Sequence, residues 1–253
     1  MMMRLLYLFA VFLLCSASAF AQVTTVAVAA NMKDAFIEIA SAFKATGKPE
    51  MRVVYGSSGN FTTQILNGAP FSLFIAADES FPLELYKKDK TVDVGEVYAI
   101  GKLAIIAKNT TGIQLQDSKA EIAKAIERAN KISIAKPDLA PYGKAAVEYL
   151  KAEGLWDLAK NKLVYADNIG VATTYVVSGA ADIGFTALSL AKSPQVVNQT
   201  NFLLLNPKLY EPIKQRMVLM RSSPAEAVEL YRFMQTPQAK SILQKYGLSL
   251  IHI

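Results

Sequence analysis

The stretch Gly56-Ser57-Ser58-Gly59 joins an apolar run to a segment with the composition of a helix. Glycines permit backbone conformations that a side chain forbids, and the first N–H groups of a helix point outward with partial positive charge. Such a corner attracts anions. A simpler alternative is that Ser58 only caps the helix that follows it. One corner does not separate these interpretations, so the question is whether the sequence repeats the arrangement.

Three further corners follow the same plan, in which a strand-like run leads into a helix start. They are Ala30-Asn31, Pro141-Tyr142-Gly143 and Asn168-Ile169. Ligands of open α/β sheets bind at the carboxyl ends of the strands, so all four corners are predicted to face one crevice. Besides backbone amides, these corners carry neutral side-chain donors in Asn31, Ser58 and Tyr142.

The four corners contain no Arg, Lys, Cys or His, and the nearby Asp34, Asp138 and Asp167 are expected to cap or favour the starts of their own helices. A site made of neutral donors binds a fully ionised oxyanion, with about 1.5 to 3 kcal/mol from each charge-assisted hydrogen bond. About seven such bonds, after desolvation, reach roughly 8 kcal/mol, or micromolar affinity. A protonated anion such as hydrogen phosphate brings a proton that finds no acceptor, so an unprotonated dianion is predicted.

The elements that position these corners alternate between β-rich runs and amphipathic helical stretches, which is typical of an α/β fold with mixed sheets flanked by helices. The number of such units predicts two lobes with a ligand cleft between them. Lobe I is expected to comprise residues 22–102 with 206–253, and lobe II residues 103–205. The chain is expected to pass between lobes near 98–108 and near 201–205 with the return through 217–220. Strands are predicted at 23–29, 52–55, 73–76, 132–135, 163–166 and 182–186, and helices at 32–45, 61–66, 119–130, 142–153, 169–178, 224–234 and 238–246.

Residues 1–21 have the pattern of a signal peptide that is removed on export. Arg4 precedes an apolar stretch too short to span a membrane, and Ala19-Phe20-Ala21 is a cleavage signal. The sequence therefore predicts a periplasmic protein. Removal of this segment takes away Cys15, the one cysteine, so the mature chain depends on core burial for stability. The alternative is a precursor that is anchored to lipid at Cys15. It is disfavoured because Leu14 stands directly before this cysteine, where a lipidated cysteine needs a small residue.

Several other function classes lack their sequence signals. The net charge of +6, reduced by one when Arg4 is removed, comes from scattered lysines without the basic stripe of a nucleic-acid-binding surface. No cluster has metal-ligand spacing, and neither common phosphate-loop motif is present. A serine hydrolase using Ser58 needs a base, but the one histidine is His252, near the end of the chain.

Four segments in this order give the chain a resemblance to the periplasmic molybdate-binding proteins of ABC importers. They are VAVAANMKDAFIEIASAF, VVYGSSGNFTTQILNGAPFSLFIAADE, DNIGVATTYVVSGAADIGFTALS and SPAEAVELYRFMQTPQAKSILQKYG. The resemblance implies a type II periplasmic-binding-protein fold. It also implies that molybdate or tungstate, as a tetrahedral dianion, is held by neutral donors. Our hypothesis is a monomer that needs no cofactor and delivers this ion to a membrane permease.

Carried over position by position, the resemblance places ligand donors at Asn31, Ser58 and the backbone of Ile169, with Ala30 and Asn168 beside them. Two positions depart from the family pattern. Ala187 stands where one branch has a tyrosine hydroxyl, and Tyr142 resembles the replacement used in another branch. Asn31 replaces a commoner hydroxyl. A binding protein for sulfate, or a sensor with the same fold, stays open as an alternative because pocket radius decides among these ions.

Overall fold

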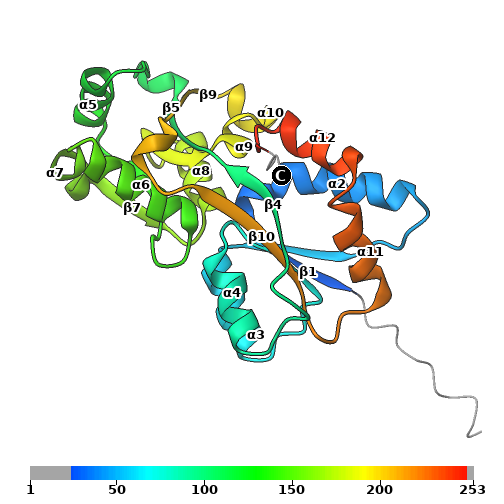
Figure 1. The fold of residues 1–253 in the computed structure, drawn as a ribbon. Helices are drawn as coiled ribbons and strands as arrows, with labels where there is room; N and C mark the ends of the chain where they lie inside the picture. Colours follow the sequence, from blue (N-terminus) through cyan, green and yellow to red (C-terminus); the bar gives the residue numbers. More distant parts are fainter. Residues whose placement is uncertain (1–23, 250–253) are drawn as a thin grey trace, which may run out of the picture.

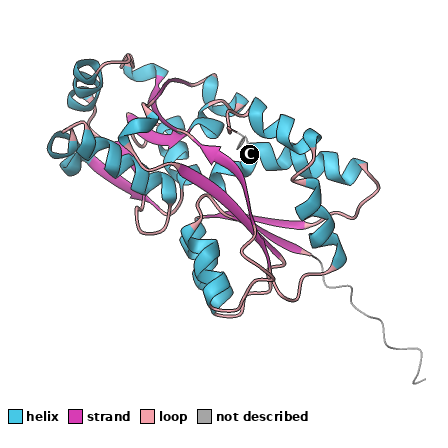
Figure 2. Cartoon of the chain, viewed as in Figure 1, coloured by secondary structure: helices cyan, strands magenta, loops and turns pink. Residues whose placement is uncertain are grey.

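The computed structural model describes residues 24–249, which form two mixed β-sheets flanked by helices (Figures 1 and 2). This two-lobed α/β architecture confirms the predicted fold class. The predicted signal peptide, Cys15 and His252 lie outside the described residues. Among residues 24–249, no helix is long and apolar enough to cross a membrane.

The first sheet has the strand order β2-β1-β3-β10-β4. Strands β1, β2 and β3 are parallel, whereas β10 is antiparallel to both β3 and β4. Apolar side chains of α2, α11 and α12 pack on one face, and those of α3 and α4 pack on the other. The strands are β1 (Thr25–Ala29), β2 (Arg52–Gly56), β3 (Leu73–Ile75), β4 (Glu96–Gly101) and β10 (Ile213–Leu219), and the helices are α2 (Lys33–Ala45), α3 (Ser58–Leu66), α4 (Ser80–Lys87), α11 (Ala225–Phe233) and α12 (Pro237–Lys245).

The second sheet has the order β7-β6-β8-β5-β9. Helices α5, α6 and α7 contribute to its larger apolar cluster, and α9 and α10 join α8 in a smaller one that includes Ala104 and Ile106 of β5. The strands are β5 (Leu103–Lys108), β6 (Ile132–Ala135), β7 (Leu163–Ala166), β8 (Ile183–Ala187) and β9 (Thr200–Leu204), and the helices are α5 (Lys119–Arg128), α6 (Pro141–Ala152), α7 (Trp156–Ala159), α8 (Ile169–Ser178), α9 (Leu188–Ala191) and α10 (Pro194–Val197). Single 3-10 turns lie at η1 (Ala30–Met32), η2 (Asn109–Thr111), η3 (Lys160–Lys162) and η4 (Pro207–Leu209).

Strands β4 and β10 run side by side between the two groups of helices (Figure 1). The chain leaves the first sheet at the end of β4 and, after the single residue Lys102, enters the second sheet at β5. It returns between β9 and β10. An isolated antiparallel bridge joins Ile100 of β4 to Ser249, so the last described residue pairs with the strand that leads to the other sheet.

The predicted elements are recovered with small shifts at their ends, except at α3. That helix begins at Ser58 and not at Phe61, because the Ser57 side chain caps it by accepting a hydrogen bond from Asn60 N. The alternative in which Ser58 is the cap is therefore wrong. Helix α4 was not predicted, because Pro82 within Ser80–Lys87 resembles a helix break although it stands in the first turn, where proline is tolerated.

Candidate functional site

All four predicted corners lie at the junction between the two sheets and contact one another. Gly59 N donates to Leu139 O across 2.9 Å, which joins the start of α3 to the loop before α6. Ser189 Oγ donates to Asn31 O across 2.7 Å. Gly170 packs against Ala30 so closely that a Cβ on this glycine would lie 3.3 Å from Ala30 Cβ. The start of α8 therefore meets the first corner, as the start of α6 meets the second.

The side-chain oxygen of Ser58 is buried and has one fixed partner. Ala77 N donates a hydrogen bond to Ser58 Oγ across 2.9 Å, and the residue is 1% exposed. Because this bond occupies an acceptor position, the hydroxyl proton of Ser58 is free to point toward a bound group. Ser58 thus offers a neutral donor from the end of β2.

Asn31 and Tyr142 come from opposite sides of the junction and share a partner, Gln215 of β10. Asn31 Nδ2 lies 3.0 Å from Gln215 Oε1, and Gln215 Nε2 lies 2.9 Å from Tyr142 Oη. Tyr98 Oη lies 2.8 Å from Gln215 Oε1 and 2.9 Å from Ala76 O. Gln215 is 0% exposed, and Asn31 and Tyr142 are each 1% exposed, so this is a fully buried polar network. In this arrangement Asn31 Oδ1 is buried without a hydrogen-bond partner among the described residues.

Backbone N–H groups at three helix starts have no hydrogen-bond partner within residues 24–249. They belong to Ser58, Tyr142 and Ile169, the first residues with an N–H group in α3, α6 and α8. The first N–H groups of a helix have no acceptor within the helix, so these three residues, each at most 4% exposed, offer free backbone donors. An oxyanion supplies several acceptors at once.

The side chain of Asn168 is already used within the protein. Its Oδ1 accepts a hydrogen bond from Val171 N across 3.0 Å and caps α8. Asn168 therefore orients the helix start, whereas Ile169 contributes through its backbone. Ala30 lies beside this helix through Gly170 and is 6% exposed.

Burial keeps the tyrosines of this network protonated. Burial, together with the neighbouring Tyr210, raises the pKa of Tyr142. Burial also raises the pKa of Tyr98 well above its ordinary value, with smaller contributions from Tyr142 and Asp78. Both hydroxyls therefore remain hydrogen-bond donors at neutral and moderately alkaline pH.

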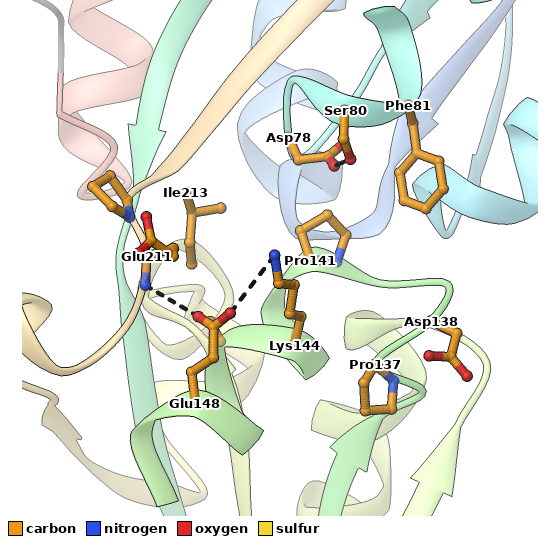
Figure 3. A pocket seen from close by; sticks show the side chains of 12 residues that line it. Asp78, Ser80, Phe81, Pro137, Asp138, Pro141, Lys144, Glu148, Glu211 and Ile213 are labelled. Atoms are coloured by element: carbon orange, nitrogen blue, oxygen red, sulfur yellow. Dashed lines mark hydrogen bonds and ion pairs between the residues drawn. The ribbon is translucent and has the colours of Figure 1, made fainter. Parts of the chain in front are cut away.

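Two hollows open on either side of the buried corners. The first, of about 330 Å³, is lined by the four carboxylates of Asp78, Asp138, Glu148 and Glu211 around Lys144 (Figure 3). Burial raises the pKa of Asp78, although hydrogen bonds from Ser80 and Phe81 and the charge of Lys144 act in the opposite direction. This excess of negative charge disfavours a dianion. The second hollow, of about 430 Å³, carries mainly neutral residues, among them Ala30, Asn168 and Gly170, with one cation, Lys33, and one carboxylate, Asp34.

The expectation that nearby aspartates cap these helices is wrong for two of them. Helix α6 has Ala140 at its N-cap and no side-chain cap, so Asp138 does not serve there. Asp167 pairs with Lys136 across 2.6 Å, and its neighbour Asn168 caps α8. Asp34 lies in the first turn of α2, where a carboxylate is favoured.

Sequence reasoning missed Gln215, Tyr98 and Ser189. The signal for Gln215 was present, because β10 alternates buried and more exposed residues and this glutamine occupies a buried position between Ile213 and Met217. A buried amide in an apolar strand face needs polar partners. Ser189 and Tyr98 gave no comparable signal, since their contacts depend on how the two sheets meet. Ala187 is buried in β8 and offers no side-chain donor, as expected.

This arrangement of two α/β lobes with helix starts converging between them defines a class of binding proteins, and the chain belongs to the family of bacterial extracellular solute-binding proteins. The model of that family matches residues 24–249. It is a family of binding proteins and not an enzyme class.

Individual relatives confirm the resemblance drawn from the sequence segments. The molybdate-binding protein ModA of Azotobacter vinelandii is 35% identical over 229 residues, with 89% of each chain covered. The molybdate-binding protein ModA of Rhodobacter capsulatus is 33% identical over 226 residues, covering 87% of this chain and 86% of that protein. The solved structure of the Azotobacter vinelandii periplasmic molybdate-binding protein superposes with a TM-score of 0.82 at 31% identity, covering 90% of this chain and all of that one.

The same fold occurs in more distant binding proteins. The sulfate-binding protein SubI from Mycobacterium tuberculosis has a TM-score of 0.73 at 16% identity, with 91% of this chain and 87% of that one covered. At this level of identity the likeness concerns the fold alone.

Proposed function

We propose that this protein is the periplasmic solute-binding component of an ABC importer and that its ligand is molybdate or tungstate. It captures the tetrahedral dianion between its lobes and delivers it, as a monomer, to a membrane permease. It is not an enzyme and needs no cofactor. Lobe I comprises residues 22–102 with 206–253, and lobe II comprises residues 103–205.

The observation that carries this proposal is the convergence of unpaired, uncharged donors from both sheets. Ser58 supplies its hydroxyl proton and its N–H group, and Tyr142 and Ile169 supply N–H groups from the opposite side. Asn31 and the Tyr142 side chain are linked to each other through Gln215, and Ala30 and Asn168 place the surrounding backbone. The names of the relatives agree with this chemistry, because the two most informative ones are molybdate-binding proteins.

The neutral donors also determine which ions are selected. Each hydrogen bond to a charged oxygen contributes about 1.5 to 3 kcal/mol, and a dianion accepts all of them. Hydrogen phosphate carries a proton that faces donors only, which costs affinity. The hydrolase alternative loses support, because the Ser58 hydroxyl accepts from a backbone amide and residues 24–249 contain no histidine to act as its base.

The test is a calorimetric titration of the mature protein with molybdate, tungstate, sulfate and phosphate in separate experiments. We expect molybdate and tungstate to bind with a dissociation constant of about 1 µM or lower, near 8 kcal/mol, and phosphate to bind much more weakly. Tighter binding of sulfate than of molybdate would reassign the ligand. Dissociation constants above about 100 µM for all four ions would overturn the proposed function.

A further inference from the structure

The buried Gln215 touches three polar side chains whose hydrogen-bonding capacities differ. Its amide lies within 3.0 Å of Asn31, Tyr98 and Tyr142. A side-chain amide keeps nearly the same shape after a half-turn that exchanges its oxygen and nitrogen. The partners of Gln215, and not its shape, therefore decide which way the amide points.

The fixed point of this network is a backbone carbonyl, which can only accept. Tyr98 Oη lies 2.9 Å from Ala76 O, and Tyr98 has a single proton to give. Once that proton is donated to Ala76 O, the Tyr98 oxygen can only accept from Gln215, 2.8 Å away. Two acceptors at this distance repel, so Gln215 has to present Nε2 toward Tyr98.

This orientation of Gln215 propagates to Asn31. The second N–H of Nε2 is directed at the Asn31 amide, 3.0 Å away, which must then present Oδ1 as the acceptor. The Asn31 amide thereby exchanges its two end atoms. Nδ2 now occupies the buried position where Oδ1 had no partner, so a donor replaces an unpaired acceptor there. On the other side, Gln215 Oε1 accepts the proton of Tyr142 across 2.9 Å. Every member of the network is then satisfied except Asn31 Nδ2, whose two N–H bonds have no acceptor among the described residues.

We propose that Gln215 is a positioning residue that turns Asn31 so that its N–H group faces the bound oxyanion, while Tyr98 fixes the orientation of Gln215. The proposal rests on the proposed function, which places the ion at these corners. In this arrangement the orientation of each hydrogen bond follows from the one before it, beginning with the bond to Ala76 O and ending with the N–H group of Asn31 that faces the ligand. If the two amides took the opposite orientation, an oxygen of Asn31 would face the ion, repel a dianion and accept a proton from hydrogen phosphate.

The test replaces Tyr98, which sets the direction, with Phe. Tyr210→Phe is the matched control, because both tyrosines are 7% exposed and Tyr210 Oη accepts a hydrogen bond from Leu103 N across 3.0 Å without touching the amides. Both variants are titrated with molybdate and with phosphate. We expect Tyr98→Phe to weaken molybdate binding about tenfold and to narrow the preference for molybdate over phosphate. Tyr210→Phe is expected to leave that preference unchanged.

Equal effects of the two variants, or an unchanged preference in Tyr98→Phe, would overturn the role of Gln215. Neutron diffraction from the ion-free wild-type protein gives a second measurement that does not depend on the variants or on ion binding. Deuterium on Gln215 directed at Tyr98 and Asn31 supports the orientation, and deuterium directed at Tyr142 overturns it. A wild-type protein that binds no oxyanion refutes the proposed function instead, and the deuterium positions still decide the amide orientation.

Discussion

The first sheet contributes polar side chains to the candidate site, which a substitution can remove, whereas the second sheet contributes mainly backbone N–H groups. Ser58 and Asn31 follow strands of the first sheet, and Gln215 lies on its β10 strand. The start of α8 in the second sheet acts through Ile169 N, while its polar neighbour Asn168 is committed to capping. A side chain can be removed without moving the backbone, so substitutions should reveal the donors of the first sheet more readily than those of the second.

The largest effect on affinity is expected for Ser58→Ala. This change removes a donor to a charged ligand, which corresponds to about 1 to 3 kcal/mol of binding free energy. The measurement is molybdate titration of the variant at neutral pH. Ser57→Ala is the matched control, because it removes the cap of α3 and lowers the free energy of unfolding by about 1 kcal/mol without removing a ligand donor. Similar affinity losses in the two serine variants would contradict the assignment of Ser58.

A somewhat smaller effect is expected for Gly59→Ala, which acts on the contact between the two sheets. The added Cβ would lie 3.0 Å from Leu139 Cα and 3.1 Å from Leu139 O, so the contact between the start of α3 and the loop before α6 has to loosen. We expect molybdate affinity to fall about tenfold, near 1.4 kcal/mol. The melting temperature should change little, because the gain in helix propensity of alanine over glycine offsets the cost of this crowding. Unchanged affinity would mean that the Gly59–Leu139 contact does not contribute to ligand capture.

The smallest effect on affinity is expected for Asn168→Ala. This variant tests whether the second sheet contributes backbone N–H groups and not side chains to the site. Loss of the cap costs about 1 kcal/mol of folding stability, measured by denaturant unfolding. Molybdate affinity should change less than about threefold, because Ile169 N–H remains. Asn168→Asp keeps an acceptor for the cap but places a negative charge near the dianion, so it should preserve stability and lose more affinity than the alanine variant. The opposite order would assign Asn168 a direct contact with the ion.

The four corners were accessible to sequence reasoning because each combines a hydrophobic strand with a recognisable helix start. This local pattern predicted α8 with its start at Ile169, and it placed Asn31, Ser58 and Tyr142 at the junction of the sheets. The choice between Ser57 and Ser58 as the cap could not be predicted, since adjacent serines have the same capping chemistry and only the backbone path separates them.

The network around Gln215 was beyond sequence reasoning for a different reason. Its members lie far apart in the chain, since Gln215 comes 184 positions after Asn31 and 73 positions after Tyr142. A single buried glutamine indicates that partners exist, but not which ones. Their identity follows from the path of β10 between the two sheets, which is a property of the tertiary structure.

The bridge between Ile100 and Ser249 protects an edge of the first sheet from pairing with other molecules. Strand β4 ends the first sheet, and Ser249 covers part of its outer margin through two backbone hydrogen bonds. Truncation before Ser249 would expose the backbone N–H and C=O groups of Ile100, and strands of other molecules could then pair with this edge and aggregate.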